Sequence, residues 1–310
     1  MFMGMKVVVF DVEHGASAFI RTPTNYAVLI DCGCTGKFSP ALYLAEKELP
    51  TIVTWNGHSL TKLIVTHPHD DHIGDVETVK EKCPPALLLR QKYDWEEVKT
   101  SEDDYDNLDT YSNWQNTYNT TPVIWPEWGM TIQSFWLTTA EAKAIGESKY
   151  INNSSIVTIA TFKGTEHQEK FLFGGDMETS GWDTLLKLRP GFKEAVKGVD
   201  FYIVSHHGHQ SGFSEALYAA MGKPILNIVS IHNYDEHIDD RYSQEAYALG
   251  RTFPDGTTRR RMTTRKDGTI TISVNNEGKY SLSTQCLIDN KTEKVANDLS
   301  WVFEAMKSRR

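Results

Sequence analysis

The stretch that decides the fold is Leu63-Ile64-Val65-Thr66-His67-Pro68-His69-Asp70-Asp71-His72. Its apolar start is too short for a helix and rich in β-branched residues, which predicts a buried strand. Three histidines and two aspartates follow at the end of this strand, where α/β proteins place their chemistry. Because ionisable side chains rarely gather beside an apolar strand without a partner that neutralises them, the stretch predicts a metal site.

The spacing of these side chains suits two ions. His67 and His69 are two residues apart, so on a locally extended chain they face the same side and can bind one ion. The adjacent Asp71 and His72 can turn toward a second ion. Imidazoles suit Zn²⁺, Mn²⁺ or iron, whereas a carboxylate favours a harder ion or a metal-bound hydroxide.

At these residues the sequence resembles the metallo-β-lactamase superfamily, whose signature is H-x-H-x-D-H after an apolar strand. Further matching motifs follow in the family's order at residues 11–20, 27–33, 152–157, 171–176 and 203–208. The resemblance implies an α/β fold, the four-layer αββα sandwich, with two divalent ions, Zn²⁺ or Mn²⁺. It is closest to the metallo-β-lactamase-like hydrolase domain of bacterial competence DNA-uptake channel proteins.

The resemblance also implies a set of metal ligands. Asp176, which follows an apolar strand and a Gly-Gly pair, is expected to bridge the two ions. Of the adjacent pair after the next strand, we expect His206 to complete the second ion's shell. His207 would then face the substrate as a donor to phosphate or a proton carrier, although spacing alone does not separate the two roles. The predicted metal set is His67, His69, Asp71, His72, Asp176 and His206.

Asp71, His207 and His237 are the predicted catalytic residues. His237 matches a family position that would donate to the leaving oxygen, although Ile238 replaces the proline that usually follows it. Where many superfamily members carry a third histidine on the first ion, this chain has Asn152-Asn153-Ser154-Ser155. Their oxygens suit a harder ion or a phosphate oxygen. The predicted substrate contacts are Asn153, Ser154, Asn233 and Tyr234.

Two polar residues nearer the start of the chain leave alternatives open. Asp31, at the end of an apolar strand, either accepts a hydrogen bond from a ligand imidazole or is an ordinary turn residue. His14, beside the turn residue Gly15, is expected to be solvated, with a place at the metal site as the alternative.

The motifs spread from residue 11 to residue 237 of a 310-residue chain, so one domain over 1–290 is predicted. An acidic, aromatic insertion at about 92–130 either covers the site, offers a surface to a protein partner or a second copy, or forms a helical hairpin with its aromatics inward. Residues 291–310 are expected to form an amphipathic helix. Residues 269–274 are expected to form an edge strand, and residues 177–188 a helix with Pro190-Gly191 as its stop.

Net charge and hydropathy limit the kinds of partner that this protein is expected to bind. The net charge of −9 repels polyanions, so a nucleic acid would need a local grip. Six basic residues between 251 and 266 are either such a groove or a solvated face. No apolar run approaches the roughly 20 residues that span a bilayer, and Asp11 interrupts the first apolar run, so a cytoplasmic protein without a membrane partner is expected. The four cysteines show no disulfide framework.

The predicted function is metal-dependent hydrolysis of a phosphodiester. Nucleic acid is the first expectation for the substrate and a small cyclic nucleotide the second. A hydroxide between ions roughly 3.5–4 Å apart would attack phosphorus in line. The alternatives are a hydrolase of lactones, thioesters or lactams, and a non-catalytic binding module that keeps the metal as a clamp.

Overall fold

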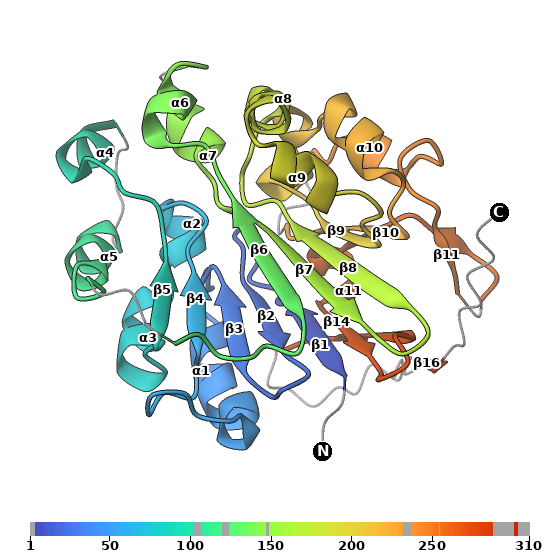
Figure 1. Ribbon diagram of the computed structural model, residues 1–310, viewed down its shortest axis with the longest axis horizontal. Helices are drawn as coiled ribbons and strands as arrows, with labels where there is room; N and C mark the ends of the chain where they lie inside the picture. Colours follow the sequence, from blue (N-terminus) through green and yellow to red (C-terminus); the bar gives the residue numbers. More distant parts are fainter. Residues whose placement is uncertain are drawn as a thin grey trace.

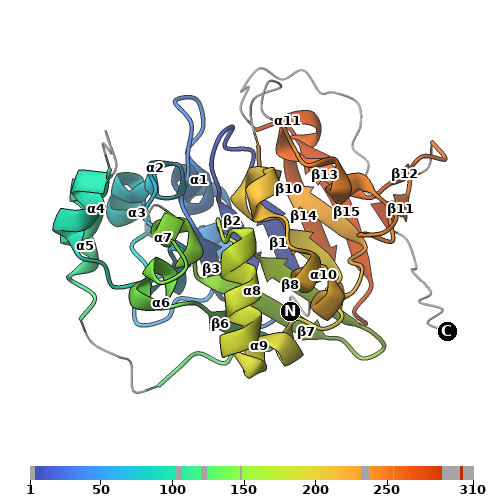
Figure 2. The same cartoon turned by 90° about the horizontal axis from the view of Figure 1, so that it is seen from above.

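The computed structural model describes residues 4–101, 107–119, 124–146, 149–231, 237–253 and 255–287, together with the backbone of Trp301 and Val302. Over these residues the chain forms two large β-sheets that pack face to face (Figure 1). Helices α1 to α3 cover the outer face of one sheet, and α8 to α10 cover the outer face of the other (Figure 2). The predicted αββα arrangement of four layers is therefore confirmed.

The first sheet has the order β16-β15-β14-β1-β2-β3-β4-β5. Its strands are β1 (Met5–Val9), β2 (Ala18–Arg21), β3 (Ala27–Ile30), β4 (Lys62–Ile64), β5 (Leu87–Leu89), β14 (Thr269–Val274), β15 (Tyr280–Gln285) and β16 (Trp301–Val302). The second sheet has the order β13-β10-β9-β8-β7-β6. Its strands are β6 (Thr131–Phe135), β7 (Val157–Lys163), β8 (Gln168–Phe173), β9 (Phe201–Ile203), β10 (Leu226–Val229) and β13 (Arg261–Thr263). A separate ribbon pairs β11 (Arg251–Thr252) with β12 (Thr258–Arg259).

The helices are short, and most connect strands across the outer layers. The α-helices are α1 (Pro40–Tyr43), α2 (Asp70–Ile73), α3 (Val76–Lys82), α4 (Trp95–Ser101), α5 (Leu108–Gln115), α6 (Thr139–Lys143), α7 (Tyr150–Asn153), α8 (Thr179–Leu188), α9 (Pro190–Ala195), α10 (Glu215–Met221) and α11 (Thr264–Asp267). A π-helix, η1 (Leu44–Glu48), follows α1, and the 3₁₀ turns are η2 (Leu49–Thr51), η4 (His206–Gly208), η5 (Gln210–Gly212) and η6 (Asp240–Ser243).

Alternation along the strands builds two apolar layers. In β1, Val7 and Val9 point between the sheets, where they join a cluster that includes Phe171 and Phe201 of the second sheet. Val8 points the other way, into the cluster beneath the outer helices. Because both faces of the central strands are buried, the strand sequences are continuous apolar runs.

Parallel pairing brings the chemical motifs to one end of the sandwich. β3, β4 and β5 run parallel in the first sheet, and β8, β9 and β10 run parallel in the second. The carboxyl ends of β4, β8 and β9 therefore carry His67–His72, Asp176 and His206–His207 to one end. A backbone hydrogen bond from Ile156 to Thr66, 3.0 Å long, ties the two sheets together there.

One predicted strand position is wrong. Residues 269–274 do not form an edge strand, because β15 pairs with β14 on the side away from β1. The predicted end of the helix before Pro190-Gly191 is confirmed, because α8 ends at Leu188. Pro190 then takes the first position of a further helix, α9, where a missing N–H costs nothing.

The predicted C-terminal helix over 291–310 lies outside the described residues, except for β16. That two-residue segment is extended and pairs with β15. Within the described ranges no helix has the length and apolar character needed to cross a membrane.

Candidate metal centre

The loop after β4 changes conformation between its two pairs of ligand-type residues. His69 is extended, with φ −70° and ψ 148°, and it precedes the single turn of α2. His67 and His69 consequently lie on one side with ring centroids 4.4 Å apart. The turn of α2 directs Asp71 and His72 toward a second group of side chains, as the spacing predicted.

One group of possible ligands consists of His67, His69 and Asp176. His67 Nε2 lies 3.9 Å from Asp176 Oδ2, and both residues are buried. The Ser155 hydroxyl accepts a hydrogen bond from the Asp176 backbone N–H at 3.0 Å and lies 3.4 Å from His67 Nδ1. Ser155 therefore supports these two residues from behind and leaves His67 Nε2 facing the site.

A second group contains His72, His207 and the same Asp176. His72 Nε2 lies 3.2 Å from Asp176 Oδ1, and His207 Nε2 lies 3.6 Å from Asp176 Oδ2. Asp71 Oδ2 approaches His207 Nε2 at 3.0 Å and His72 Nε2 at 3.6 Å. Asp176 is thus shared by the two groups, which is the position that the sequence predicted for a bridging carboxylate.

Asp31 fixes the base of the loop. Its backbone takes the left-handed region, with φ 57°, directly after β3. The carboxylate accepts hydrogen bonds from the Thr66 backbone at 2.7 Å and the Thr66 hydroxyl at 2.8 Å. It also lies 2.8 Å from His72 Nδ1. Asp31 is therefore an acceptor for a site imidazole, which is the first of the two predicted alternatives.

The electrostatics of the centre favour positive charge between the carboxylates. Burial lowers the pKa of His207, yet the Asp176 and Asp71 carboxylates outweigh burial and raise this pKa to about 9. Burial also opposes ionisation of Asp176, but the His72 and His207 rings hold the pKa of that carboxyl well below its usual range. Burial, together with the His72 and His69 rings, lowers the pKa of His67 well below its usual range. A proton or a metal ion would supply the positive charge.

The donor atoms fit divalent metal ions. The Nε2 atoms of His67, His72 and His207 are buried, and within the described part of the chain none has a hydrogen-bond partner of good geometry. A buried imidazole nitrogen without such a partner is costly in a folded protein, whereas a metal ion would satisfy it. Imidazole nitrogens with carboxylate oxygens suit Zn²⁺, Mn²⁺ or iron.

The family comparison agrees with this geometry. The model of the metallo-beta-lactamase superfamily matches residues 11–116, from the loop after β1 through the metal loop into the insertion. The chain has the metallo-beta-lactamase fold. This is a fold of metal-dependent hydrolases, and the possible ligand groups lie in the loops just described.

Three solved structures illustrate how distant the similarity is. The metallo-beta-lactamase fold protein YhfI from Bacillus subtilis is 14% identical, with 75% of this chain and 89% of that chain covered and a TM-score of 0.39. Zn²⁺-bound PqqB from Methylobacterium extorquens is 11% identical, with coverage of 64% and 72% and a TM-score of 0.38. A long form RNase Z from yeast is 10% identical, with coverage of 77% and 39% and a TM-score of 0.36. No curated protein sequence matches significantly.

In this metallo-beta-lactamase fold, the adjacent histidines after β9 are placed opposite to the expectation. Both have φ 50°, a left-handed conformation that turns the two rings apart. His207 joins the carboxylates, and its Nδ1 lies 3.0 Å from the Ser230 carbonyl oxygen. His206 Nδ1 instead lies 2.8 Å from the Ser211 hydroxyl, on the partly exposed side. The structure therefore places His207, and not His206, among the possible ligands.

The predicted substrate contacts at Asn153 and Ser154 are not supported. Both residues have no exposed surface. Asn153 Oδ1 accepts from the Glu178 backbone at 3.2 Å, and the Ser154 hydroxyl lies 2.8 Å from the Tyr93 hydroxyl. These side chains hold the scaffold beneath α7 and α8. Both residues are buried because α7 ends only a few residues before β7, which keeps residues 153–155 inside the fold.

The remaining predicted residues lie on the segment after β10. Asn233 and Tyr234 fall outside the described residues. His237 is exposed, and two residues later the Asp239 backbone donates a 2.9 Å hydrogen bond to the Gly208 carbonyl. The segment that begins at His237 is thus anchored beside the loop that carries His207.

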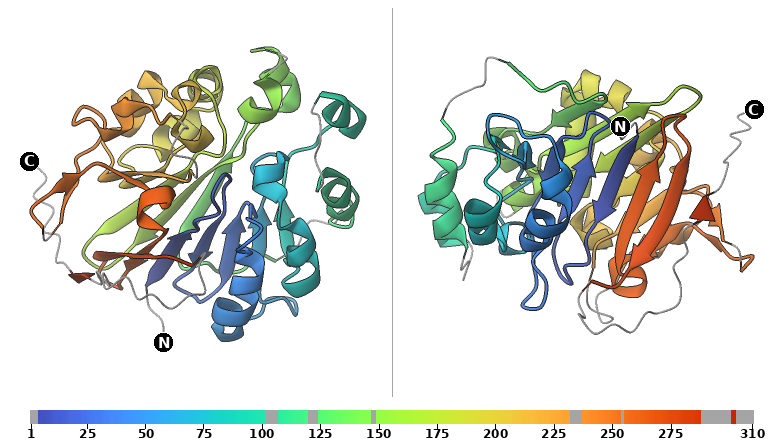
Figure 3. Two further views of the ribbon diagram at one scale, coloured as in Figure 1. Left: turned by 180° about the vertical axis from the view of Figure 1, so that it is seen from behind. Right: turned by 90° about the horizontal axis from the view of Figure 1, so that it is seen from below.

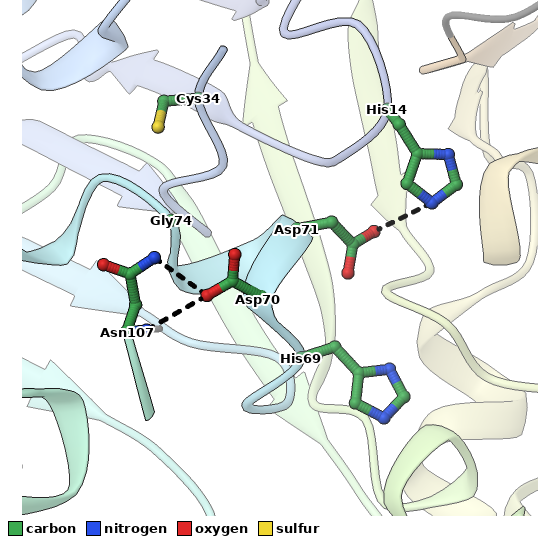
Figure 4. A pocket seen from close by; sticks show the side chains of 7 residues that line it. All are labelled: His14, Cys34, His69, Asp70, Asp71, Gly74 and Asn107. Carbon is green, nitrogen blue, oxygen red and sulfur yellow. Dashed lines mark hydrogen bonds and ion pairs between the residues drawn. The ribbon is translucent and has the colours of Figure 1, made fainter. Parts of the chain in front are cut away.

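A pocket of about 370 Å³ opens beside the possible ligands (Figure 4). Its lining residues are His14, Cys34, His69, Asp70, Asp71, Gly74 and Asn107. Asn107 belongs to the insertion, directly before α5, and its side-chain amide donates to Asp70 Oδ1 at 2.8 Å. The insertion therefore forms one wall of the pocket. Its helices α4 and α5, drawn in teal, lie at the β5 end of the first sheet (Figures 1 and 3).

Sequence reasoning did not select three residues of this centre. Ser155 was one of four polar residues before a strand, and only its position directly before the strand's first buried residues could have singled it out. Asn107 lies among similar polar residues of the insertion, so no local signal marks it. His14 was expected to be solvated, but its Nε2 lies 3.7 Å from Asp71 Oδ2.

Proposed function

We propose that this chain is a phosphodiesterase that uses two divalent ions sharing Asp176. The observation that carries the proposal is the position of this carboxylate between the two groups of histidines. His67, His69 and Asp176 would hold one ion, and His72, His207, Asp71 and Asp176 the other. This assignment gives His207 the ligand role first predicted for His206.

The ligand group of His67, His69 and Asp176 favours a catalytic ion over a purely structural one. It offers three protein ligands, and catalytic ions keep a position open for water or substrate, whereas structural ions are fully enclosed by protein. Ser155 stands near the place where a third imidazole would be expected, but its hydroxyl is engaged by the Asp176 backbone. The pocket beside the site gives a substrate access to this open position.

Two ions in such a centre would supply an activated water and neutralise the charge that develops on a phosphoryl group. The residues of the chain hold and orient the ligands. Asp31 fixes His72 through Nδ1, and the Ser230 carbonyl fixes His207 through Nδ1. These contacts select the ring orientation in which Nε2 faces the centre. We assign the proton that reaches the leaving oxygen to His237, which is exposed beside the His207 loop.

A compact phosphodiester fits the charges better than a long nucleic acid. Arg259 makes two hydrogen bonds with the Asp267 carboxylate, at 2.8 and 2.6 Å. Arg260 lies 3.2 Å from Glu245. Two of the six basic residues are therefore neutralised within the protein. A nucleotide-sized diester needs fewer cationic contacts than a polymer, so it is the first substrate to test.

Several sequence predictions are kept as proposals beside this function. They are the relation to competence DNA-uptake proteins, a cytoplasmic location, and a partner or second copy bound through the 92–130 insertion. Substrate contacts at Asn233 and Tyr234 belong with them.

The test begins with metal-free protein reloaded with Mn²⁺, Zn²⁺ or Mg²⁺. The substrates are bis(4-nitrophenyl) phosphate, a cyclic nucleotide, linear DNA and circular DNA, with a lactone, a thioester and a lactam beside them. We expect metal-dependent turnover of diesters. Asp71→Asn and Asp176→Asn should each lose more than about 100-fold in rate, because even partners one step behind a metal ligand contribute 10- to 100-fold.

The matched control is Asp255→Asn, on the exposed turn between β11 and β12. An asparagine retains the side-chain acceptor that Thr257 uses there, so this variant should keep full activity. Turnover of a lactone, thioester or lactam without turnover of any diester would replace the phosphodiesterase proposal with the alternative substrate class. A protein that binds both ions and is inert toward every substrate would favour the non-catalytic binding module.

A further inference from the structure

His14 lies at the metal centre, although its place beside the turn residue Gly15 predicted a solvated side chain. It lies on the loop between β1 and β2, next to Glu13, which has φ 58°, and Gly15, which has φ 141°. Figure 4 shows its ring directed at the Asp71 carboxylate across one side of the pocket. The ring also lies against His207, with centroids 4.8 Å apart and planes inclined by 33°.

Three imidazole nitrogens surround one oxygen of Asp71. Asp71 Oδ2 lies 3.0 Å from His207 Nε2 and 3.6 Å from His72 Nε2. It lies 3.7 Å from His14 Nε2. Two ligands that are each about 2.0–2.2 Å from one ion at a tetrahedral angle are about 3.3–3.6 Å apart. The spacings around Asp71 Oδ2 are close to this value, and His14, Asp71 and His207 together form a possible ligand group.

We propose that His14 is a further ligand of the second ion. The inference rests on the proposed two-ion centre and adds a residue from the first strand pair, which the H-x-H-x-D-H motif does not include. His72, His207, Asp71 and Asp176 would hold this ion from within the protein, and His14 would close its solvent side. The group of His67, His69 and Asp176 offers fewer protein ligands, so an ion held there would have room for a substrate oxygen.

The backbone keeps His14 in register with its neighbours. The Ala16 N–H donates to the Asp71 carbonyl at 3.1 Å, and the Ser230 hydroxyl donates to the Gly15 carbonyl at 2.6 Å. A Cβ on Gly15 would lie 2.5 Å from the Asp71 carbonyl oxygen, so only glycine allows this approach. The loop is therefore fixed to α2 and to the strand end beside His207. Such anchoring is required of a ligand supplied by a loop.

Metal binding tests the inference without reference to turnover. Metal-free wild type, His14→Ala and His14→Glu would be titrated with Zn²⁺ by calorimetry and with Co²⁺ by visible absorption. We expect two sites in the wild type. His14→Ala should keep the wild-type affinity at the site of His67 and His69. At the other site its affinity should fall about 10- to 100-fold, and the visible absorption of the Co²⁺ bound there should change. His14→Glu, which restores a ligand oxygen, should recover part of the lost affinity.

His167→Ala is the matched control, because His167 lies on the β7–β8 turn, away from the centre. It should bind both ions as the wild type does. Unchanged affinity at both sites in His14→Ala would overturn the inference and leave the proposed function standing. Equal loss at both sites, or loss of the circular dichroism of the folded protein in both His14 variants, would also overturn it. A wild type that binds two ions but hydrolyses no diester would remove the proposed function alone.

Discussion

His206 and His207 show how backbone conformation decides the role of a residue. The two are adjacent in the sequence and chemically identical, yet the positive φ at each turns one ring toward Asp71 and Asp176 and the other toward Ser211. A non-glycine residue in this region costs of order 1 kcal/mol or more and persists where the surroundings enforce it. Here the Ser205 carbonyl and Gly208 N–H bond, 3.1 Å long, closes the turn.

The first prediction separates these two histidines by metal content. His207→Ala should lose one equivalent of metal, because its Nε2 faces both carboxylates. His206→Ala should retain two equivalents, because its Nδ1 contacts Ser211 and its ring is partly exposed. Metal analysis of the purified variants after dialysis measures this directly. Two equivalents in His207→Ala and one in His206→Ala would return the ligand role to His206.

For single residues, the sequence predicted the features that depend on residue type and spacing. It did not predict side-chain orientations that depend on the backbone φ angle. His67, His69, Asp71, His72 and Asp176 come together as the motif indicated. The orientation of His207 and the burial of Asn153 do not follow from spacing, because they depend on a left-handed turn and on how α7 packs. Nor does spacing show that the loop of His14 folds back onto α2.

At the scale of elements, the insertion is both a packed unit and a wall of the pocket. Tyr111 and Trp114 of α5 are buried, and Trp95 contacts Tyr111 with ring centroids 5.8 Å apart. The predicted inward packing of the aromatics therefore holds for Trp95 of α4 and for Tyr111 and Trp114 of α5, whereas Trp125 of the same insertion is exposed. The insertion was also expected to cover the site. It does so where Asn107 donates a hydrogen bond to Asp70. The two interpretations are compatible because the aromatics use one side of the helices and Asn107 lies at the end of α5.

The second prediction concerns this contact. Asn107→Ala removes the side-chain amide that donates to Asp70, while the backbone N–H of residue 107 stays 3.3 Å from the same carboxylate oxygen. We expect a loss of about 1 kcal/mol in unfolding free energy, below the roughly 1.5–3 kcal/mol of a hydrogen bond to a charged group, because the site is partly exposed and the backbone N–H still contacts Asp70. The KM for a small diester should rise with little change in kcat, because the pocket wall loosens while the ligands stay.

Asn116→Ala serves as the control at the other end of α5, where the amide donates to the Ser112 carbonyl at 3.0 Å. Urea unfolding and steady-state kinetics measure the two variants. A comparable loss of stability in Asn116→Ala with an unchanged KM is the expected contrast. An Asn107→Ala variant with unchanged KM would mean that this wall does not contact the substrate.

Strand identity was predicted well because the central strands are buried on both faces and read as continuous apolar runs. The end of α8 was predicted, but the short helix α9 that follows it was not. A proline after a helix is equally consistent with a stop alone and with the first residue of a next helix. The place of residues 269–274 within the sheet depends on the hairpin to Tyr280–Gln285, whose alternation of polar and apolar residues the sequence analysis did not use.

At the scale of the whole molecule, net charge and its distribution bear on the substrate. The protein carries a formal charge of −9, and Arg259, Arg260 and Arg261 of the most basic stretch make contacts within the protein. Asp267, the partner of Arg259, also accepts the Thr263 backbone N–H at 3.0 Å. Arg261 is half-buried, with a guanidinium N–H 3.4 Å from the Asp239 carbonyl oxygen. These arginines hold β12, β13 and α11 together, which is a structural use of the charge.

The last prediction follows from that use. Each phosphate that a protein neutralises adds about 0.7 to 0.9 to the slope of log affinity against log salt. Because Arg259 and Arg260 are paired internally, we expect weak DNA binding with a slope below about 2, measured by fluorescence anisotropy across a salt series. Changing Arg259, Arg260 and Arg261 together to Glu should lower the unfolding free energy by about 1–3 kcal/mol, since it leaves Asp267 without its partner.

That triple variant should therefore lose stability and leave the salt slope nearly unchanged. Lys266→Glu, an exposed substitution on α11, is the control for a purely electrostatic effect, because it alters surface charge without breaking the Arg259–Asp267 pair. It should change neither the unfolding free energy nor the hydrolysis of a small diester. A wild-type slope of about 4 or more that falls in both variants would instead show a phosphate-binding groove, and a nucleic acid would become the better substrate.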